Sequence, residues 1–303
     1  MITPFQSLAC PLDGEPLQRD GAAWRCAAGH SFDIARQGYI NLLPVQSKRS
    51  RDPGDSKEMV AARHRFLDPG PGAGPCQPGP YQPIAAAVSR ALLADLAPGA
   101  AASCLDAGCG EGYYLRQLAA AAGERHPLAL LGLDISKWAV MAAAKQDKRA
   151  NWVVGSNAGL PVQTGTLDRV LCMFGFPVHA EFARVLRPGG ELLLVDAGPD
   201  HLRELREIIY PALKPERSAN PRAPDGFTAL ATENVRYPLQ LAGAAQITDL
   251  LAMTPHLYRA SAAGRARAAA LSALTVTVDV RLARFRRIAA SSAPTPPDMP
   301  PLI

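Results

Sequence analysis

Three glycines at alternate positions, Gly108, Gly110 and Gly112, follow a short apolar segment and precede a segment with helical periodicity. Glycine lets the backbone turn sharply and approach a ligand closely, so a strand–loop–helix unit of this kind commonly cradles a nucleotide. Asp134 ends the next apolar segment, about twenty residues after Gly112. A carboxylate at that spacing can accept hydrogen bonds from two ribose hydroxyls. These residues therefore predict a nucleotide-binding site.

The carboxylates of this loop indicate which nucleotide it binds. A dinucleotide fingerprint reads G-x-G-x-x-G, whereas this loop reads G-x-G-x-G and also carries Asp106 and Glu111. A carboxylate is unfavourable beside a pyrophosphate but favourable beside the sulfonium and ammonium groups of S-adenosylmethionine. The loop therefore favours this methyl donor, and a generic glycine-rich turn or an NAD site remains the alternative.

Two later segments fit a methyl-donor site. The segment VVGSNAGLPV occupies the place where such methyltransferases usually hold adenine, and Asn157 could hydrogen-bond the adenine edge; a plain loop is the alternative. The segment 169–177 ends in CMFGFP and lacks the Asp/Asn-Pro-Pro-aromatic motif of enzymes that methylate exocyclic amines. This absence argues against transfer to the N6 atom of adenine.

Strands and helices must alternate along the chain to position these residues. We expect helices at 56–67, 84–97, 113–122, 137–146 and 179–186, and strands at 103–105, 128–133, 152–154, 169–173 and 191–195. Such alternation predicts a doubly wound α/β fold, a Rossmann-like class I methyltransferase domain with a mainly parallel sheet. Residues 274–282 alternate between apolar and polar types, which indicates a half-buried, antiparallel strand.

Proline and glycine divide the chain into three parts. Residues 1–45 are rich in turn residues and leave room only for short strands, which predicts a small N-terminal domain. Residues 46–80 combine a basic loop, a helix and a Pro/Gly-rich linker. Residues 81–303 then form the expected methyltransferase domain.

The composition excludes several classes of protein. With 303 residues, 48% hydrophobic and 19% charged, the chain can build a large core and is not expected to be disordered. A net charge of +5 permits a polyanionic partner without requiring one. The sequence has neither an apolar run of about 18 residues nor the features of a signal peptide. We therefore expect a cytoplasmic protein without a membrane partner, whose six cysteines are not a disulfide framework.

The sequence also resembles the bacterial 23S rRNA (guanine-N1)-methyltransferases over nearly the whole chain. Its most specific segment is GHSFDIARQGYINLLPVQSKRSRDPGDSKEMVAAR, with DAGCGEGYY, GLDISKWAV and MTPHLYRA further along. The resemblance implies methyl transfer from S-adenosylmethionine to N1 of a guanine in a hairpin loop of 23S rRNA. It also implies that Tyr81, Gly110, Glu111 and His201 contact the cofactor.

The resemblance further implies a zinc-ribbon or zinc-knuckle domain of the form C-x-x-C…C-x-x-x-H. The chain has Cys10, Cys26 and His30 at the matching positions, with Asp13 where the second cysteine is expected. Aspartate can bind zinc through oxygen, and a water molecule could also complete the tetrahedron. We expect one zinc ion on these residues, and a decayed site held by packing is the alternative.

Clustered cations suggest where the RNA would bind. We expect phosphate contacts from the basic residues between the zinc ligands and the linker, namely Lys48, Arg49, Arg51, Lys57, Arg63 and Arg65. Guanine N1 carries a proton at neutral pH, so a base must accept it. The sequence leaves this catalytic residue unassigned among Asp33, Asp55 and His201.

Two rival functions and the assembly state remain open from the sequence. A small-molecule S-adenosylmethionine-dependent methyltransferase would not need residues 1–65, so RNA dependence of these residues discriminates between the two enzymes. A non-catalytic RNA-binding protein on a methyltransferase fold would not need an intact cofactor loop. A homodimer is kept open as the assembly.

Overall fold

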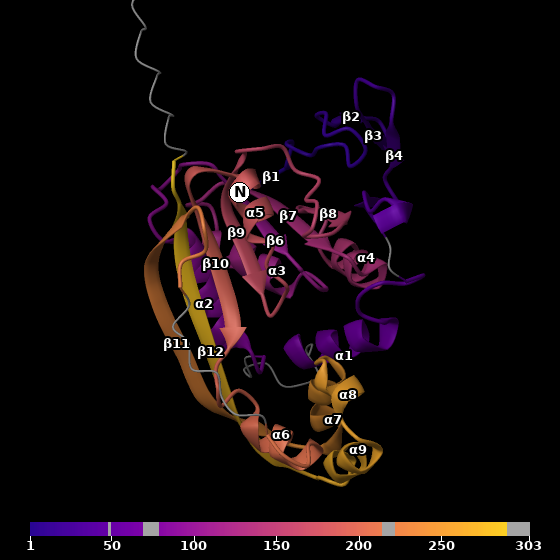
Figure 1. The fold of residues 1–303 in the computed structure, drawn as a ribbon, viewed down its shortest axis with the longest axis vertical. Coiled ribbons are helices and arrows are strands. Elements are labelled where there is room, and N and C mark those ends of the chain that lie inside the picture. The colour runs from indigo at the N-terminus through magenta and orange to yellow at the C-terminus, as the bar shows by residue number, and fades with distance from the viewer. Residues whose placement is uncertain (48–49, 69–78, 214–221, 290–303) are drawn as a thin grey trace, which may run out of the picture.

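The computed structural model describes residues 1–47, 50–68, 79–213 and 222–289 of the chain (Figure 1). Within these residues the strands form one large sheet and one small sheet. The strands of the large sheet are β1 (Ile2–Thr3), β5 (Tyr39–Asn41), β6 (Ala102–Ala107), β7 (Leu128–Asp134), β8 (Asn151–Val154), β9 (Leu167–Met173), β10 (Leu186–Ala197), β11 (Phe227–Leu241) and β12 (Leu274–Arg287). Their order is β11-β12-β10-β9-β6-β7-β8-β5, with β1 paired to β7 outside this order.

The centre of the large sheet is parallel. Strands β10, β9, β6, β7 and β8 all pair in the parallel sense, so their carboxyl ends share one edge of the sheet. The chain changes direction of winding beside β6, from β7 on one side to β9 on the other, and open α/β sheets bind ligands at such a switch point. The predicted doubly wound α/β fold is therefore confirmed.

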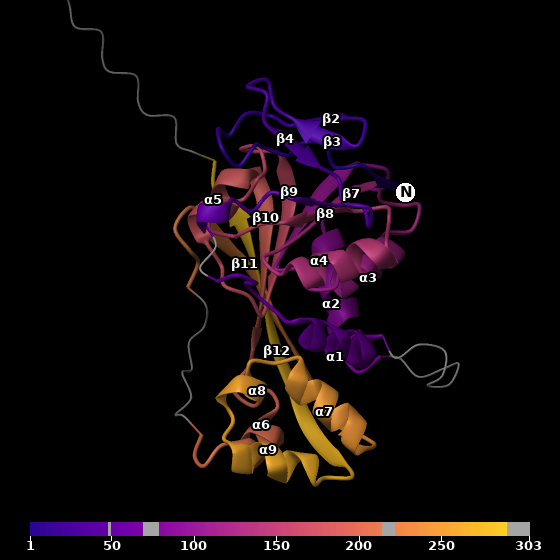
Figure 2. The same ribbon diagram turned by 90° about the vertical axis from the view of Figure 1, so that its right-hand side faces the viewer.

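Helices cover both faces of this parallel centre. Figure 2 shows α2 (Gln82–Leu93), α3 (Tyr113–Ala122) and α4 (Lys137–Gln146) on one face, with α5 (His179–Val185) on the other. Two clusters of buried apolar side chains correspond to these two faces. Burial on both faces explains why β9, LDRVLCM, is buried along its whole length.

Most helix limits agree with the sequence prediction, because capping residues mark them. The side chain of Ser136 accepts a hydrogen bond from the Ala139 amide at the start of α4, whose bounds match the expected ones. Two segments differ clearly from the prediction. The helix expected at 84–97 is α2, which begins at Gln82 and ends at Leu93. The segment Arg187–Gly190 was expected to be a turn between a helix and a strand, but it belongs to β10. A register shift between Leu186 and Glu191 takes up the extra residues.

The N-terminal residues are joined to the large sheet at both ends. The small sheet contains β2 (Gln18–Asp20), β3 (Ala23–Arg25) and β4 (Ser31–Asp33). Before it, β1 pairs with β7, and after it, β5 pairs with β8. The short helices η1 (Val45–Ser47) and α1 (Lys57–Leu67) lead away from this region. The domain boundary at residue 45 thus remains a prediction, with β5 of its N-terminal part lying in the large sheet.

The C-terminal residues add an antiparallel pair and a helical cap. Strands β11 and β12 pair antiparallel over most of their length, which confirms the expected antiparallel strand and extends it to Arg287. The cap contains α6 (Arg203–Ile209), α7 (Ala244–Ala252), α8 (His256–Arg259) and α9 (Ala262–Ala269). It lies beyond the carboxyl edge of the sheet and contacts α1 (Figures 1 and 2). Among the described residues, no helix is long and apolar enough to cross a membrane.

Candidate cofactor and metal sites

A cavity of about 1450 Å³ opens at the carboxyl edge of the parallel strands. Its walls are the glycine loop after β6, the end of β7, the loop after β9, the end of β10, and parts of α1 and α8. From there it continues to the loop Cys10–Gly14 of the N-terminal region. The cavity therefore connects the two sites that the sequence predicted separately.

The glycine loop requires glycine at each of its three positions. The φ angles are 105° at Gly108, 54° at Gly110 and 81° at Gly112, all in the region that other residues rarely adopt. A Cβ atom at Gly112 would lie 2.5 Å from the ring of Trp152, so this glycine also permits close packing. A Cβ atom at Gly108 would meet nothing within 4 Å, so the backbone there borders open space that a ligand can approach.

Asp106 is a buried carboxylate without a partner. It lies near the carboxyl end of β6, is 1% exposed, and neither of its oxygens has a hydrogen-bond donor within the described residues. Burial, together with the nearby charge of Asp134, raises the pKa of Asp106 to about 8. An unpaired buried carboxylate is costly, and a cationic ligand in the cavity would offset that cost. The site therefore fits a ligand with positive charge.

Asp134 holds the glycine loop in place. One of its carboxylate oxygens accepts a hydrogen bond from the Gly110 amide at 2.9 Å, and the other accepts one from the Ser136 amide at 2.8 Å. Burial raises the pKa of Asp134. Since each carboxylate oxygen has a second lone pair, Asp134 can still accept hydrogen bonds from ribose hydroxyls.

Two other expected residues also present unpaired polar atoms. Asn157 lines the cavity, and its amide nitrogen donates to the carbonyl oxygens of Ala107 and Phe176, both at 3.3 Å. Its amide oxygen has no donor in the described part of the chain. Tyr81 lies at the start of α2 with its hydroxyl buried and likewise unpaired, and its ring packs edge-on against Phe66. Both atoms are available to a bound ligand.

His201 is a neutral side chain on the cavity wall. Burial lowers its pKa to about 4, so the ring is uncharged at neutral pH. Its Nδ1 atom accepts a hydrogen bond from the Asp279 amide at 3.3 Å, so the single ring proton lies on Nε2. The ring stacks on Phe174 with centroids 5.6 Å apart. His201 can therefore donate a hydrogen bond, but it is poorly arranged to accept a proton.

Glu111 is placed differently from the other expected residues. Its Oε2 atom lies 3.0 Å from the guanidinium of Arg116 and 2.8 Å from the amide nitrogen of Gln146, and Nδ1 of His64 lies 3.6 Å away. This cluster joins the glycine loop to α1, α3 and α4. Any contact of Glu111 with a cofactor falls to its Oε1 atom or its backbone.

The three candidates for the catalytic base differ in position. Asp33 lies on β4 and does not line the cavity, and His201 has its Nδ1 atom occupied. Asp55 lines the cavity but forms an ion pair with Arg63 at 2.5 Å. The sequence reasoning did not consider Asp196, which lines the cavity at the carboxyl end of β10. Its signal was available, because it ends an apolar strand as Asp134 does.

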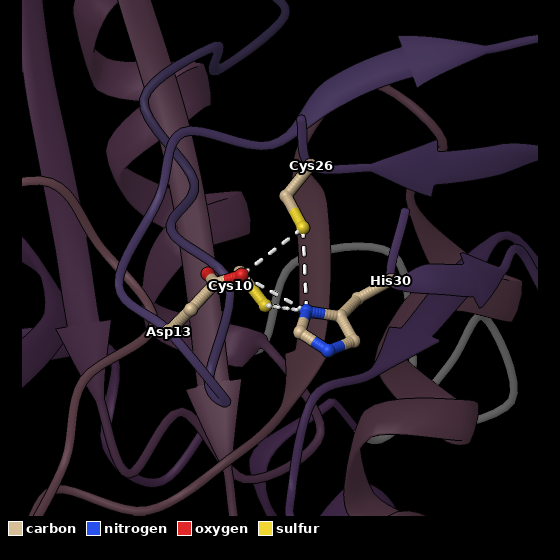
Figure 3. A group of neighbouring side chains, drawn as sticks. All are labelled: Cys10, Asp13, Cys26 and His30. Carbon is tan, nitrogen blue, oxygen red and sulfur yellow. Dashed lines mark hydrogen bonds and ion pairs between the residues drawn. The ribbon is translucent and has the colours of Figure 1, made fainter. Parts of the chain in front are cut away.

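The four expected metal ligands lie together (Figure 3). The ligand atoms of Cys10, Asp13, Cys26 and His30 are all within 4.8 Å of one another. Nδ1 of His30 lies 3.5 and 3.4 Å from the two sulfur atoms, and Oδ2 of Asp13 lies 3.3 Å from the Cys26 sulfur. Two ligands of a tetrahedral zinc ion are roughly 3.3–3.8 Å apart. The His30–Asp13 pair, at 2.9 Å, is closer than this, and the other three distances fit a zinc ion.

Two tight turns bring these ligands together. The Gly14 amide donates to the Cys10 carbonyl at 2.9 Å, and the Gly29 amide donates to the Cys26 carbonyl at 3.0 Å. The other carboxylate oxygen of Asp13 accepts a hydrogen bond from the Glu15 amide, which orients the side chain. The local backbone thus fixes Asp13 beside the thiols where the family motif has a cysteine.

The basic residues expected to contact RNA, between the zinc ligands and the linker, form more contacts within the protein than the sequence suggested. Arg63 bonds to Asp55 and to the Met253 carbonyl oxygen, and Arg65 forms an ion pair with Asp249 at 2.6 Å. Lys57 lies over the ring of Trp138, 4.1 Å from its centroid. Arg63 and Arg65 are therefore not the free cations that the sequence suggested. Arg51 is exposed, and Lys48 and Arg49 lie outside the described residues.

Comparison with known proteins gives two family matches and relatives that cover most of the chain. A zinc-ribbon model described as "RlmA, N-terminal" matches residues 8–51, and a model described as "Methyltransferase domain" matches 104–190. A "Putative 23S rRNA (guanine-N(1)-)-methyltransferase" of Micromonospora griseorubida is 38% identical over 93% of this chain and 97% of its own length. The "23S rRNA (guanine(748)-N(1))-methyltransferase" of Streptomyces fradiae is 34% identical, over 77% and 80% respectively. A similarly named putative enzyme of Bacillus subtilis is 31% identical, over 91% and 95%.

Proposed function

The chain belongs to the family of 23S rRNA (guanine-N1)-methyltransferases, and from this premise we propose its substrates and the roles of its residues. It transfers a methyl group from S-adenosylmethionine to N1 of a guanine in a hairpin loop of 23S rRNA. The observation that carries the proposal is the buried, unpaired carboxylate of Asp106 beside an open glycine loop. S-adenosylmethionine supplies an activated methyl group and the positively charged partner that this carboxylate lacks.

The cofactor-binding residues act in three ways. Asp106 pairs with the cationic part of the donor, and Asp134 accepts hydrogen bonds from the ribose. Asn157 accepts a hydrogen bond from the adenine amino group through its unpaired oxygen. The other proposed contacts, from backbone, hydroxyl and imidazole groups, are Tyr81, Gly108, Gly110, Glu111, Gly112 and His201.

Alignment of the acceptor with the donor is the main task of the protein in such a transfer. A displacement at carbon needs the attacking nitrogen in line with the breaking bond, so the walls of the cavity supply orientation and exclude water. The target guanine has to leave its stack to enter the cavity, which favours a loop nucleotide. His201, uncharged and carrying its proton on Nε2, is suited to donate a hydrogen bond there.

We infer that the N-terminal region binds the RNA. Cys10, Asp13, Cys26 and His30 hold one zinc ion, which stabilises a sheet too small to have a core of its own. Residues 1–45 and the following segment 46–80 contact the hairpin, and residues 81–303 bind the cofactor. Continuity of the cavity from the Cys10–Gly14 loop to the glycine loop supports this division of tasks.

Primer extension on cellular rRNA tests the function. A methyl group on guanine N1 blocks base pairing, so reverse transcriptase stops one nucleotide before it. In 23S rRNA from a strain that lacks the gene, we expect one stop to disappear and to return with the intact gene. If every stop caused by N1-methylguanine persists in the deletion strain, this rRNA is not the substrate.

A further inference from the structure

Six carboxylates line the cavity within the described residues, and four of them already have partners. Asp55 pairs with Arg63, and Asp134 accepts two backbone hydrogen bonds. Glu111 bonds to Arg116 and Gln146. Glu181 bonds to Arg184 and to the Leu160 amide. The carboxylates of Asp106 and Asp196 accept no hydrogen bond from the described part of the chain. They are the two carboxylates of the cavity left for ligands.

The sheet places these two carboxylates on opposite sides of one loop. Strand β9 lies between β6, which carries Asp106, and β10, which carries Asp196. Burial is the largest cause that raises the pKa of the Cys172 thiol on β9 to about 12, and the charges of Asp106 and Asp196 add to it. Both carboxylates therefore lie near the end of this strand. Asp106 lies near the end of β6, just before the glycine loop, and serves the methyl donor. The side of Asp196 is therefore left for the acceptor.

The loop between the two carboxylates is aromatic and strained. Phe174 has a φ angle of 48°, unusual for a bulky residue, and strained residues of this kind cluster at functional sites. Its amide donates to the Val195 carbonyl at 2.8 Å, and its ring stacks on His201. These contacts leave Phe176 at the cavity wall with 88% of its surface exposed. An exposed aromatic ring at a nucleic-acid site is suited to stack on an unpaired base.

Guanine and Asp196 have complementary groups. The Watson–Crick edge of guanine presents two adjacent donors, N1–H and the exocyclic amino group. A carboxylate has only acceptors, and its two oxygens can receive both donors at once. Adenine, which presents an acceptor at N1, would leave one of these oxygens without a donor. The same carboxylate could therefore select guanine and take its N1 proton.

We propose that Asp196 is the catalytic base, and that it reads the N1–H and amino groups of a guanine stacked on Phe176. This inference rests on the proposed function. The N1 proton passes to an oxygen of Asp196, and the electron pair left on N1 forms the bond to the methyl carbon. The methyl–sulfur bond breaks, and its electron pair returns to sulfur. Methylated guanine, protonated Asp196 and neutral S-adenosylhomocysteine are the products.

The groups around Asp196 are consistent with this role. Desolvation raises its pKa, which moves it toward the range in which a base can accept a proton at neutral pH. Arg281, its register partner on β12, opposes this shift by its positive charge. On the other side, β9 contributes the Cys172 thiol, which is uncharged at neutral pH. Asp196 is thus ionised in part of the accessible range and able to receive a proton.

Single-turnover methylation of a hairpin transcript tests the inference, once the wild-type protein has been used to map the acceptor guanine. Asp196→Asn keeps the size of the side chain but cannot take a proton, so the rate should fall roughly 10²- to 10⁴-fold. S-adenosylmethionine affinity should not change, and Asp196→Glu should restore part of the rate. Asp225→Asn, at an exposed position that does not line the cavity, is the matched control and should behave as wild type.

Three further readouts separate catalysis from a structural role. The wild-type rate should level off above the pKa of Asp196, whereas the residual rate of Asp196→Asn should keep rising with pH. Replacing the acceptor by inosine, which lacks the amino group, should slow wild-type protein more than Asp196→Asn. Phe176→Ala should raise KM for the RNA roughly 5- to 150-fold with little effect on cofactor affinity, and Phe176→Tyr should rescue it.

The inference is overturned if Asp196→Asn methylates the transcript within about threefold of the wild-type rate. Loss of S-adenosylmethionine affinity in parallel with the rate would also overturn it, because Asp196 would then belong to the donor side. Failure of the wild-type protein to methylate any guanine of 23S rRNA is a different result, which contradicts the proposed function itself.

Discussion

At the scale of single residues, the fold leaves one carboxylate of the cavity in an unfavourable state. Asp106 is buried and has no hydrogen-bond donor among the described residues, and its pKa of about 8 means that it is mostly protonated in the free protein at neutral pH. A cationic ligand reverses this preference, since it favours the charged form. Cofactor binding should therefore release a proton.

The first prediction concerns the pH dependence of cofactor affinity. Between about pH 6 and pH 8 the ligand must displace the proton of Asp106, so S-adenosylmethionine should bind more tightly as pH rises. Asp106→Asn should bind weakly and without this pH dependence. Isothermal titration calorimetry in buffers of different ionisation enthalpy measures both affinity and proton release. A wild-type affinity that is flat over this window, with no proton released, would contradict the role of Asp106.

The same residue predicts a pH dependence of stability. In the unfolded chain this carboxyl group loses its proton near its ordinary pKa of 3.8, and in the folded protein near 8. The folded state binds more protons between these values, so the free energy of unfolding should fall as pH rises through the window. The loss is at most about 1.4 kcal/mol per pH unit. Urea denaturation should show Asp106→Asn gaining stability relative to wild type from pH 5 to pH 8.

Two glycines of the loop provide a matched pair of variants. Gly108→Ala places a methyl group in open space, so it should cost about 1–3 kcal/mol of backbone strain while obstructing the cofactor. Gly112→Ala adds a clash with the Trp152 ring to similar strain, so it should destabilise the fold far more. Thermal unfolding and cofactor titration separate the two effects. A stable Gly108→Ala protein with normal cofactor affinity would exclude close approach of the ligand there.

At the scale of elements, the small sheet of β2, β3 and β4 depends on the group Cys10, Asp13, Cys26 and His30. Its strands are three residues long and contribute few buried side chains. A small module of this kind is commonly stabilised by metal binding. The large sheet retains its own two apolar clusters, so loss of the metal should affect the two parts unequally.

Metal removal tests this inequality. Protein purified without chelator should contain about one zinc per chain, and chelation should lower RNA affinity while cofactor affinity is kept. Asp13→Cys should bind zinc more tightly, because thiolate is the stronger ligand. Elemental analysis and competition with a zinc indicator provide the measurements. Protein that contains no zinc and has a folded N-terminal sheet would show that packing alone holds this region.

Helix α1 is joined to the segment before it and to the helical cap through Arg63. This side chain is 21% exposed and bonds to both Asp55 and the Met253 carbonyl. Arg65 is 61% exposed, and its partner in the described part of the chain is Asp249. Arg63→Ala should therefore lower the free energy of unfolding by about 2 kcal/mol. Arg65→Ala should lower it by less than about 1 kcal/mol, as expected of a surface ion pair. Equal losses in urea denaturation would show that Arg63 does not connect the two parts.

At the scale of the whole molecule, the sequence predicted best what local residues determine. The limits of α3 and α4 follow from glycine, serine and apolar periodicity, and the structure has them at the expected residues. Strand β11 was not expected, because its side chains are largely exposed and Pro238 interrupts a typical strand composition. Its stability comes from pairing with β12, more than thirty residues later, and no local pattern records such a pairing.

Long-range placement also explains what was missed at the site. The glycine loop, Asp134 and the four metal ligands were found because each has a recognisable spacing. Asp196 also ends an apolar strand, but its place opposite Asp106 depends on the strand order, which brings β10 beside β9. The engagement of Arg63 was missed for the same reason, since its partner Met253 lies far along the chain. The motifs that indicate chemistry are local in the sequence, but the hydrogen-bond and ion-pair partners of a side chain can lie far along the chain.

Methylation of 23S rRNA by the purified protein is the decisive test of the proposed activity. The substrate is rRNA from a strain that lacks the gene, incubated with S-adenosylmethionine labelled in its methyl group, and the RNA is then digested to nucleosides. We predict that the label appears only in N1-methylguanosine, at a single hairpin-loop position, and that Gly108→Ala protein transfers none. Label in another position of guanine, in another nucleoside, or in no RNA at all would contradict the account.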